Sequence, residues 1–362
     1  MSRRPILIMA GGTGGHVFPG LAVAEQLRAQ GESICWLGTA TGLEARLVPA
    51  AGIEFHVLPV SGLRGKGLTA WLLAPWRLGV ALWAALLLLM RLKPRAVLGL
   101  GGFASGPGGL MAAALGYPLV IHEQNAIAGM TNRWLAGRAD LVLEAFAGTF
   151  PPARQAVTVG NPVREDIRAL PDPAIRMAGR EGPLRLLVVG GSLGALALNT
   201  QVPNALAQMP VAARPLVRHQ AGTRTLEQAR QAYDQAGVQA TVTAFIEDMA
   251  EAYAWADLVI CRAGALTVSE LAAAGMAALL VPYPHAVDDH QQANARHLSE
   301  VGAARIIRQD GLDPEELASW LATLDRPRLQ DMACRARTLA RPEAARQVAE
   351  ACLALAGEGQ HP

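Results

Sequence analysis

Charged residues, aromatic residues and cysteines are all scarce in this chain of 362 residues. Charged residues make up 17% of it, aromatic residues 5% and hydrophobic residues 51%. A chain this apolar and this poor in charge is not intrinsically disordered, and its length suffices for two domains, each with a core. The formal net charge is only +2, which together with the shortage of aromatic residues excludes a general nucleic-acid-binding protein.

Cysteine is too rare and too dispersed to organise the fold. No two of the four cysteines form a C-x-x-C pair, so neither a zinc site nor a disulfide framework is indicated; they are Cys35, Cys261, Cys334 and Cys352. This pattern indicates a reducing compartment. The N-terminus MSRRPILIMAGG has an apolar stretch too short for a signal peptide. We therefore expect a buried first strand and a protein that stays on the cytoplasmic side.

Acidic residues are absent between Phe55 and His122. This segment contains the most apolar run of the chain, Leu78–Met90, which is shorter than the roughly 20 residues that a membrane span needs. A transmembrane helix is therefore disfavoured, and two alternatives stay open. The run forms either a core helix or a helix partly exposed to an anionic membrane. The segment also holds six basic residues (Arg64, Lys66, Arg77, Arg91, Lys93 and Arg95) and three tryptophans (Trp71, Trp76 and Trp83).

Two halves of the chain open with the same pattern. An apolar strand at Ile6–Ala10 is followed by a glycine loop, a helix from Pro19 to about Gln30 and a second strand, which is a βαβ unit of a parallel sheet. The pattern restarts at Leu184, after a proline-rich connector at 160–183. We predict an α/β protein of two doubly wound halves with the ligand at the carboxyl ends of the strands, in a cleft between the halves. Further strands are expected at 34–37, 55–58, 95–100, 118–121 and 140–143, and at 215–219, 240–243, 257–261 and 278–281.

Three glycine clusters follow strands. GGTGGH begins at Gly11 and GGSLGA at Gly190, at matching places in the two halves. Each is either a structural turn or a cradle of backbone N–H groups for an anion. The third cluster, GGFASGPGG from Gly101, is either a tight loop or a second anion cradle beside the basic apolar segment. As a cradle it would suit an acceptor with both a phosphate and a lipid tail.

Two polar groups stand at strand ends of the first half. His16 follows the first glycine loop and is either a general base that takes a proton from a hydroxyl or a histidine bonded to the start of a helix. The sequence HEQN, from His122 to Asn125, puts four polar side chains where apolar ones are expected. Because buried polar groups are costly unless paired, we favour a ligand-facing role over an internal hydrogen-bond network.

Two further groups stand in the second half. Glu270 follows Thr267 at capping-box spacing, so it either caps a helix or accepts the hydroxyls of a ribose. In DDHQQANA, Asp288, Asp289 and His290 are a poor metal constellation, and we expect no metal. Gln291 and Gln292 are better suited to hydrogen-bonding a polyhydroxylated ligand.

The order of these motifs resembles the MurG family of glycosyltransferases, from Gly11 to Ala295. Its members add N-acetylglucosamine to the lipid-linked muramoyl-pentapeptide precursor of peptidoglycan. The resemblance implies a GT-B fold, no metal and no cofactor. It also implies an inverting transfer from UDP-N-acetylglucosamine to the C4 hydroxyl of lipid I, which yields lipid II and UDP. The motifs that carry the resemblance are GGTGGHVFPGLAVA, GGFASGPGG, HEQN, GNPVR, GGSLGA, CRAGALTVSE and DDHQQANA.

The resemblance also implies domains and partners. The domain of residues 1–163, joined by a C-terminal helix at about 341–357, would bind the acceptor and the anionic cytoplasmic face of the inner membrane as a peripheral protein. Residues 164–340 would bind the UDP-sugar. Partner proteins would come from cell-wall synthesis, and nucleic acid is not expected.

The site residues that the resemblance implies are spread over both domains, with His16 as the residue most like a general base. The family has R-S-G where this chain has R-A-G at Arg262–Gly264, which affects one small side chain. Thr13, Gly14 and Gly15 would lie near the donor sugar and the acceptor, Asn125 would contact the N-acetylglucosamine, Arg164 and Ile246 would hold the uridine, Ser192 would touch the diphosphate, Ala265, Leu266, Thr267, Val268, Ser269 and Glu270 would form the nucleotide cradle with Glu270 on the ribose, and Gln291 with Gln292 would bind the sugar.

Three rival functions remain open at this point. The first is another glycosyltransferase or a sugar-nucleotide epimerase, against which the basic apolar segment argues. The second is a nicotinamide-dependent oxidoreductase, which the missing G-x-G-x-x-G argues against. The third is a non-catalytic membrane-docking protein, which would have no use for the polar clusters at the strand ends.

Overall fold

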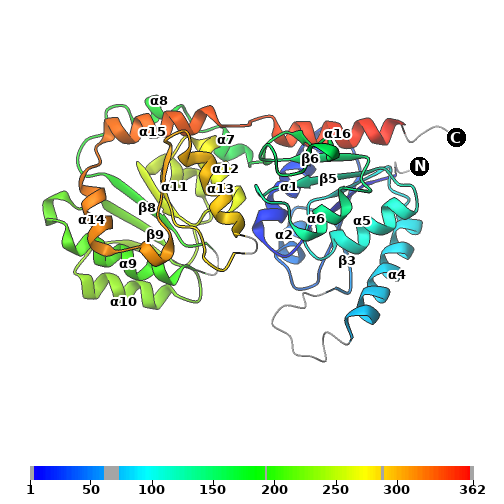
Figure 1. The fold of residues 1–362 in the computed structure, drawn as a ribbon, viewed down its shortest axis with the longest axis horizontal. Helices are drawn as coiled ribbons and strands as arrows, with labels where there is room; N and C mark the ends of the chain where they lie inside the picture. Colours follow the sequence, from blue (N-terminus) through cyan, green and yellow to red (C-terminus); the bar gives the residue numbers. More distant parts are fainter. Residues whose placement is uncertain (1–3, 61–72, 192–193, 287–288, 359–362) are drawn as a thin grey trace. The chain divides into compact units, whose positions relative to one another are not determined.

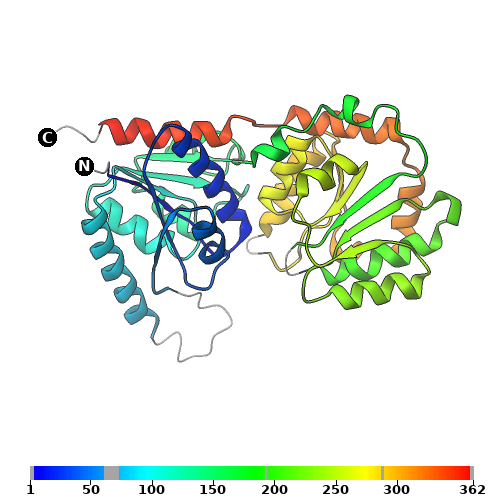
Figure 2. The same ribbon diagram turned by 180° about the vertical axis from the view of Figure 1, so that it is seen from behind.

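The computed structural model describes residues 4–60, 73–191, 194–286 and 289–358. The chain divides into two compact units. Unit 1 comprises Met1–Arg164 and Arg341–Pro362, and unit 2 comprises Glu165–Ala340. Figures 1 and 2 show one sheet with helices on both faces in each unit. The predicted α/β class is confirmed, since every strand pairing in both sheets is parallel.

The sheet of unit 1 has the order β3-β2-β1-β4-β5-β6-β7, so the strand order reverses between β1 and β4. Its central strands are buried along their whole length because helices cover both faces. The expected strands are present within one or two residues, and the two-residue β7 was too short to predict. The strands are β1 (Ile6–Met9), β2 (Ile34–Gly38), β3 (Glu54–Val57), β4 (Ala96–Gly99), β5 (Leu119–Glu123), β6 (Leu141–Glu144) and β7 (Val157–Thr158), and the helices are α1 (Gly14–Ala29), α2 (Glu44–Ala50), α4 (Ala74–Leu92), α5 (Ser105–Ala114), α6 (Met130–Leu135) and α16 (Ala344–Glu358).

The sheet of unit 2 has the order β10-β9-β8-β11-β12-β13 and repeats the reversal between β8 and β11. The connector expected at 160–183 contains two short helices, and β13 was not predicted. The strands are β8 (Arg185–Val189), β9 (Leu216–Gln220), β10 (Thr241–Thr243), β11 (Leu258–Cys261), β12 (Ala277–Leu280) and β13 (Ala304–Ile306), and the helices are α7 (Glu165–Arg168), α8 (Pro173–Met177), α9 (Leu196–Gln208), α10 (Leu226–Ala236), α11 (Met249–Trp255), α12 (Ala265–Ala274), α13 (His290–Ser299), α14 (Pro314–Ala322) and α15 (Arg326–Thr338).

The C-terminal helix α16 is part of the core of unit 1. Val348, Ala349 and Cys352 are fully buried in the same apolar cluster as Ile6 and Ile8 of β1. The chain therefore leaves unit 1 once and returns to it at Arg341, and the last helix completes the core around the first strand.

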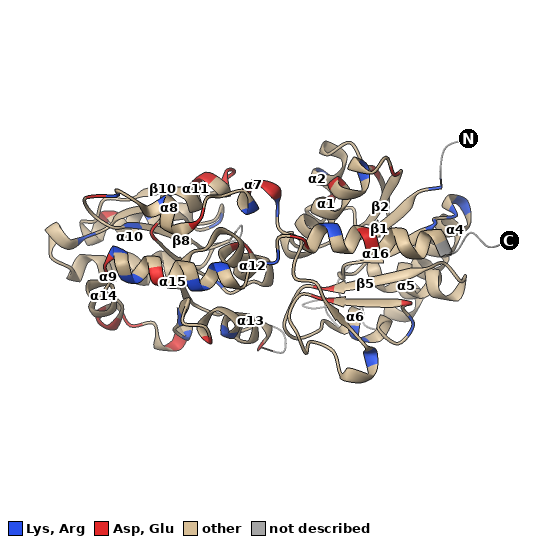
Figure 3. Cartoon of the chain, turned by 90° about the horizontal axis from the view of Figure 1, so that it is seen from above, with Lys and Arg blue, Asp and Glu red and all other residues tan. Residues whose placement is uncertain are grey.

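Helix α4 contains the apolar run whose role the sequence left open. It buries only Ala81, Ala85 and Leu89, which repeat every four residues and so form one narrow stripe. Trp76 and Trp83 are 74% and 62% exposed. The core-helix alternative is therefore wrong. Among the described residues, α4 is the one helix long and apolar enough to cross a membrane by length and composition, and it carries Arg77 in its first turn and Arg91 in its last. Figure 3 shows basic residues on α4. Trp71, Arg64 and Lys66 lie outside the described residues.

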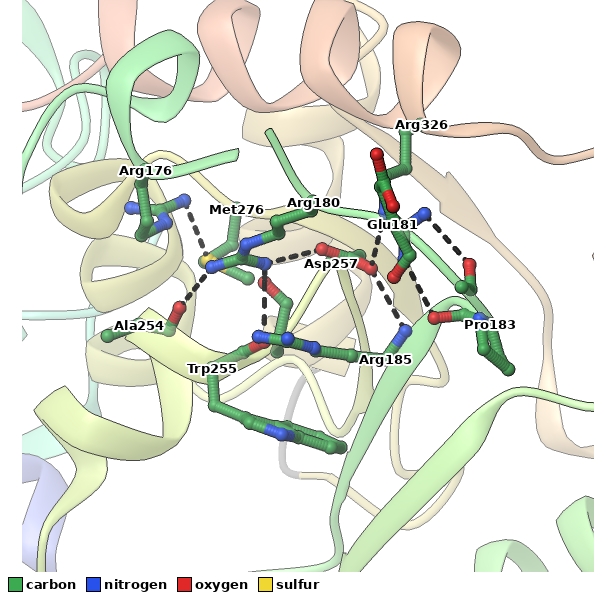
Figure 4. Close-up of polar contacts among 12 residues, drawn as sticks. Arg176, Arg180, Glu181, Pro183, Arg185, Ala254, Trp255, Asp257, Met276 and Arg326 are labelled. Carbon is green, nitrogen blue, oxygen red and sulfur yellow. Dashed lines mark hydrogen bonds and ion pairs between the residues drawn. The ribbon is translucent and has the colours of Figure 1, made fainter. Parts of the chain in front are cut away.

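A buried charge cluster lies where the strands of unit 2 begin (Figure 4). The Asp257 carboxylate has no exposed surface and pairs with Arg180 and, at 3.4 Å, with Arg326. Its Oδ2 also accepts a hydrogen bond from the backbone N–H of Arg185, the first residue of β8, at 3.0 Å. The cluster joins the connector to β8 and β11 at the edge opposite the carboxyl ends, so its role is structural.

Candidate functional site

The candidate motifs of unit 1 follow three neighbouring strands, β1, β4 and β5, and Arg164 follows the edge strand β7. The loops after β1 and β4 touch, because a Cβ on Gly102 would lie 2.5 Å from the carbonyl oxygen of Gly11. Gly102 also has a φ of +83°, a conformation that other residues rarely adopt. Glycine at this position is required for the two loops to pack at the strand-order reversal, where ligands of such sheets bind.

The first glycine loop is shorter than predicted. Gly14 and Gly15 are already the first residues of α1, and Thr13 has the extended backbone of an N-cap residue. The helix also continues through Pro19, where its start was predicted. The expected cradle is therefore the start of a helix, where the partial positive charge of the helix dipole lies.

His16 lies in the first turn of α1, next to both loops. Its Nδ1 is 3.4 Å from Oγ1 of Thr13, and a Cβ on Gly101 would lie 3.1 Å from its Nε2. The imidazole is half-buried and lies where β1 and β4 end. This geometry leaves the general-base role as a prediction and puts the ring beside Thr13, another predicted site residue.

The third glycine cluster mainly serves packing. A Cβ on Gly108 would overlap the sulfur of Met9, and one on Gly109 would lie 2.7 Å from Cδ1 of Leu135. The hydroxyl of Ser105 is buried and donates to the carbonyl of Met9 at 2.8 Å and that of Gly101 at 2.7 Å. These contacts pack α5 closely against the sheet. They therefore favour the interpretation of this cluster as a tight loop over that of an anion cradle.

The expectation that the HEQN side chains face a ligand is wrong for the first three residues. His122, Glu123 and Gln124 are all buried. His122 Nε2 is 2.9 Å from the carbonyl of Gly160, which can only accept, so Nδ1 accepts from the amide of Gln124 at 3.0 Å. Burial lowers the pKa of His122, although the Gly160 hydrogen bond and the charge of Glu123 oppose this. The structure therefore favours the internal network, since each of these three side chains hydrogen-bonds within unit 1, although Oε1 of Gln124 is buried without a partner.

Asn125 is the half-buried member of the motif and is held by Glu123. Oε1 of Glu123 accepts from the backbone N–H of Asn125 at 2.9 Å and from its side-chain amide at 3.0 Å. Oε2 accepts from Asn132 at 2.8 Å and from the N–H of Gly129 at 3.1 Å. The predicted sugar-binding amide is thus oriented by a buried carboxylate with four donors.

Arg164 ends the first segment of unit 1 and lies over the ring of Phe18, with 5.3 Å between the guanidinium carbon and the ring centre. Phe18 belongs to α1 and is itself half-buried. The predicted uridine ligand Arg164 is therefore packed on the helix that carries His16.

In unit 2 the predicted residues follow β8, β11 and β12, again three neighbouring strands, except Ile246, which follows the edge strand β10. Ser192 lies outside the described residues. Helix α12 begins at Ala265 directly after β11, with Gly264 as its N-cap. Thr267 is therefore inside the helix, and the capping-box interpretation of Glu270 is wrong. Leu266, Thr267 and Ser269 are half-buried, whereas Ala265 and Val268 are buried.

Glu270 is 8% exposed and is held by a tyrosine. The hydroxyl of Tyr253, on α11, donates to Oε2 of Glu270 at 3.1 Å. Tyr253 has no exposed surface, so it reaches the carboxylate from inside the unit. This contact leaves the ribose role of Glu270 as a prediction and identifies a residue that orients it.

Two other predicted residues, Ile246 and Gln291, each take part in a hydrogen bond between a backbone N–H group and a glutamine side chain. The N–H of Ile246 donates to Oε1 of the buried Gln220 at 3.0 Å, which holds the segment after β10 against the end of β9. Oε1 of Gln291 accepts from the N–H of Tyr283 at 2.9 Å, and Gln292 beside it is half-buried.

No group of three or more His, Cys, Asp or Glu residues that could hold a metal ion occurs among the residues that the structure describes. Asp289 and His290 are at the start of α13, and Asp288 lies outside the described part of the chain. The expectation that this segment binds no metal stays a prediction.

The sequence did not predict three residues that hold other residues of the site in place. Tyr253 bonds to Glu270, Gln220 to Ile246, and Asn132 to Glu123, which itself orients Asn125. Gln220 carried only a weak signal, because Arg218 and His219 before it in β9 are polar as well. Tyr253 and Asn132 carried none, because each lies on a helix and meets its partner only through packing.

Two family models match the chain. The glycosyltransferase family 28 N-terminal domain matches residues 6–144, and the glycosyltransferase family 28 C-terminal domain matches residues 185–349. Together they span both sheets except β7, and all the predicted site residues except Arg164.

The chain is similar to named proteins over nearly its whole length. One from Alkalilimnicola ehrlichii is 61% identical over 351 residues, which cover 96% of this chain and 98% of the relative. One from Marinobacter nauticus is 56% identical and covers 97% of each chain. Both are named UDP-N-acetylglucosamine--N-acetylmuramyl-(pentapeptide) pyrophosphoryl-undecaprenol N-acetylglucosamine transferase.

Solved structures agree with this similarity. The crystal structure of MurG from Acinetobacter baumannii superposes with a TM-score of 0.84 at 44% identity, covering 97% of this chain and 99% of that one. A UDP-N-acetylglucosamine 2-epimerase superposes with a TM-score of 0.65 at 15% identity, covering 99% of each chain. The second likeness shows the fold alone and lends no support to the epimerase alternative.

Proposed function

This chain belongs to the MurG family of glycosyltransferases, and on that premise we propose that it transfers N-acetylglucosamine from UDP-N-acetylglucosamine to lipid I. The acceptor is undecaprenyl-diphospho-N-acetylmuramoyl-pentapeptide, and the products are lipid II and UDP. The observation that carries the proposal is the full-length identity of 61% to a protein named for this transfer. The convergence of predicted residues on the central strands of both sheets supports it.

In this proposal unit 2 binds the donor. The start of α12 at Ala265 follows β11 at a carboxyl edge, and a helix start stabilises the negative charge that collects on a departing diphosphate. Glu270 accepts the ribose hydroxyls and Ile246 holds the uridine, as does Arg164, the residue that directly precedes unit 2. Ser192 contacts the diphosphate, while Gln291 and Gln292 bind the sugar.

Unit 1 binds the acceptor in the same proposal. The C4 hydroxyl oxygen of the muramoyl sugar attacks C1 of N-acetylglucosamine on the face opposite UDP, and the bond from C1 to the diphosphate oxygen breaks. The hydroxyl proton passes to His16, whose ring lies beside Thr13 and Gly101. Asn125 binds the N-acetyl sugar, oriented by the buried Glu123. No step calls for a metal or a cofactor.

The membrane-facing surface in this proposal is the outer side of α4. Trp83 and several exposed apolar residues lie between the basic Arg77 and Arg91, and the exposed Trp76 directly precedes Arg77. Aromatic side chains favour the interface, and each basic residue adds about 1 kcal/mol of attraction to an anionic leaflet. Such a surface supports reversible attachment to the cytoplasmic face of the inner membrane. The exposed residues are Trp76, Leu78, Val80, Trp83, Leu87 and Met90.

The test is release of UDP from UDP-N-acetylglucosamine in detergent, with and without a lipid I analogue, in the presence of EDTA. We expect release only with the acceptor and at the same rate in EDTA as in magnesium. Release that needs magnesium would keep the transfer but contradict the metal-free mechanism. No release under either condition, despite donor binding, would overturn the proposed acceptor.

A further inference from the structure

Glu44 is a fully buried acid that no part of the mechanism above uses. It is the first residue of α2 and has an exposed fraction of 0%. Its Oε2 accepts a hydrogen bond from the backbone N–H of Gly12 at 3.0 Å. Its Oε1 accepts from the N–H of Thr39 at 3.0 Å and from the Thr39 hydroxyl at 2.6 Å. One carboxylate thus joins the first glycine loop to the segment after β2.

Three glycines make room for this carboxylate. A Cβ on Gly11 would lie 2.5 Å from Oε1 of Glu44, and one on Gly38 would lie 2.6 Å from its Cγ. A Cβ on Gly42 would overlap both carboxylate oxygens. The glycine at the start of GGTGGH is therefore needed for the approach of Glu44, and a side chain there would displace the acid before it met any ligand.

The carboxylate is a fixed negative charge on the inner side of the loop. Burial acts to raise the pKa of Glu44, but hydrogen bonds from the Thr39 hydroxyl and from backbone amides, that of Gly12 among them, outweigh it and hold the pKa below its ordinary value. Glu44 is therefore ionised at neutral pH, and a charge-assisted hydrogen bond holds the Gly12 amide.

The direction of the Gly12 amide decides which part of the loop meets a ligand. Because its N–H points inward to Glu44, this amide is already occupied by an anion. The ligand-facing part of the loop therefore begins at Thr13, the residue beside His16. Rotation of the Gly12 peptide would move Thr13 and the start of α1 with it.

We propose that Glu44 is a positioning residue for the transfer, which holds Gly12 inward so that Thr13, the start of α1 and His16 are presented to the acceptor. The inference rests on the proposed function. Glu44 touches no reacting atom and acts through the loop. A misplacement of about 1 Å in such a site costs up to about 100-fold in rate.

The decisive variant is Glu44→Gln. Its Oε1 still accepts from Thr39, but its amide group opposes the N–H of Gly12, so one bond of the three is broken selectively. We expect kcat for UDP release to fall at least about 10-fold, with the Kd for UDP within about twofold of wild type because unit 2 binds UDP. Hydrogen exchange of the peptide over residues 10–17 should accelerate.

Two controls separate positioning from general loosening. Thr39→Val removes the hydroxyl bond but keeps the Gly12 bond, and we expect kcat within about threefold of wild type. Glu144 has a similar set of donors, since it accepts from the N–H groups of Gly148 and Phe150 and from the Thr158 hydroxyl. Glu144→Gln should lower the thermal midpoint and leave exchange over residues 10–17 at the wild-type rate.

Gly42→Ala tests the inference without changing the charge of the protein, because the added Cβ displaces the carboxylate of Glu44. It replaces Glu44→Gln as the test variant if Glu44→Gln does not fold. It should reproduce the loss of kcat and the faster exchange. Wild-type kcat in a folded Glu44→Gln or Gly42→Ala protein would overturn the inference, and so would an equal loss of kcat in Thr39→Val. Failure of the wild-type protein to release UDP would instead overturn the proposed function.

Discussion

The hydroxyl of Tyr253 donates a hydrogen bond to Oε2 of Glu270 at 3.1 Å, and both side chains are buried. Glu270 lies in the middle of α12, whose N-cap residue is Gly264. Tyr253 therefore orients the carboxylate that we predict to bind the ribose.

Tyr253→Phe tests this relationship. We expect KM for UDP-N-acetylglucosamine to rise about 3- to 10-fold with little change in kcat. A hydrogen bond to a charged group contributes about 1.5–3 kcal/mol, and Glu270 keeps part of its binding energy for the ribose after its carboxylate reorients. Glu270→Ala should raise the same KM further. Steady-state kinetics of UDP release measures both, and an unchanged KM in Glu270→Ala would remove Glu270 from the ribose site.

His16→Ala should lower kcat by about 100- to 10,000-fold, the range that a general base contributes, while the Kd for UDP stays near wild type. His56→Ala is the control, because His56 lies on β3 at the edge of the same sheet and pairs with Glu54. Turnover near the wild-type rate in His16→Ala would eliminate it as the base.

Replacing Trp83 and Leu87 by glutamate should reduce binding to vesicles that contain anionic lipid by about 10-fold or more, without loss of UDP binding. Both side chains are on the exposed side of α4. Co-sedimentation with vesicles measures the effect. Ile175→Glu, at an exposed apolar position of unit 2, is the matched control and should bind as wild type does. Equal binding by all three proteins would refute the membrane role of α4.

Asp257→Asn should destabilise unit 2 by up to about 3–5 kcal/mol, because it removes the fully buried counter-charge of the half-buried Arg180 and Arg326. Glu251→Gln removes one member of an exposed pair with Arg218 and should cost less than about 1 kcal/mol. Urea denaturation compares the two variants, and similar midpoints would show that the buried cluster does not stabilise the unit.

Acid should weaken unit 2 through His219. Burial lowers its pKa from the ordinary 6.5 to about 3, so the folded protein keeps it neutral. The unfolded chain takes up the proton first as the pH falls. Stability is therefore complete above pH 6.5 and is lost progressively from 6.5 down to about 3, by up to about 1.4 kcal/mol per pH unit.

His219→Gln isolates this contribution. The difference in thermal midpoint between wild type and the variant should be largest above pH 6.5 and should shrink as the pH is lowered toward 4. A difference that is constant with pH would show that His219 does not titrate on unfolding in this range.

Local sequence determined the two parallel sheets and the approximate place of the site. Continuous apolar strands, glycine loops and helix patterns depend on neighbouring residues, so β1, β8 and their loops were predictable. Parallel topology then brings the loops after β1, β4 and β5 to one edge, which made Thr13, His16 and Asn125 reasonable candidates.

Tertiary structure alone decided which of these polar residues are partnered and which surfaces are exposed. His122 and Glu123 are inside, and α4 is half-exposed, because burial depends on what packs from elsewhere in the chain. The bonds from Gly12 to Glu44 and from Tyr253 to Glu270 join residues 32 and 17 positions apart. Sequence spacing does not encode such contacts, because packing of separate helices against a shared sheet creates them.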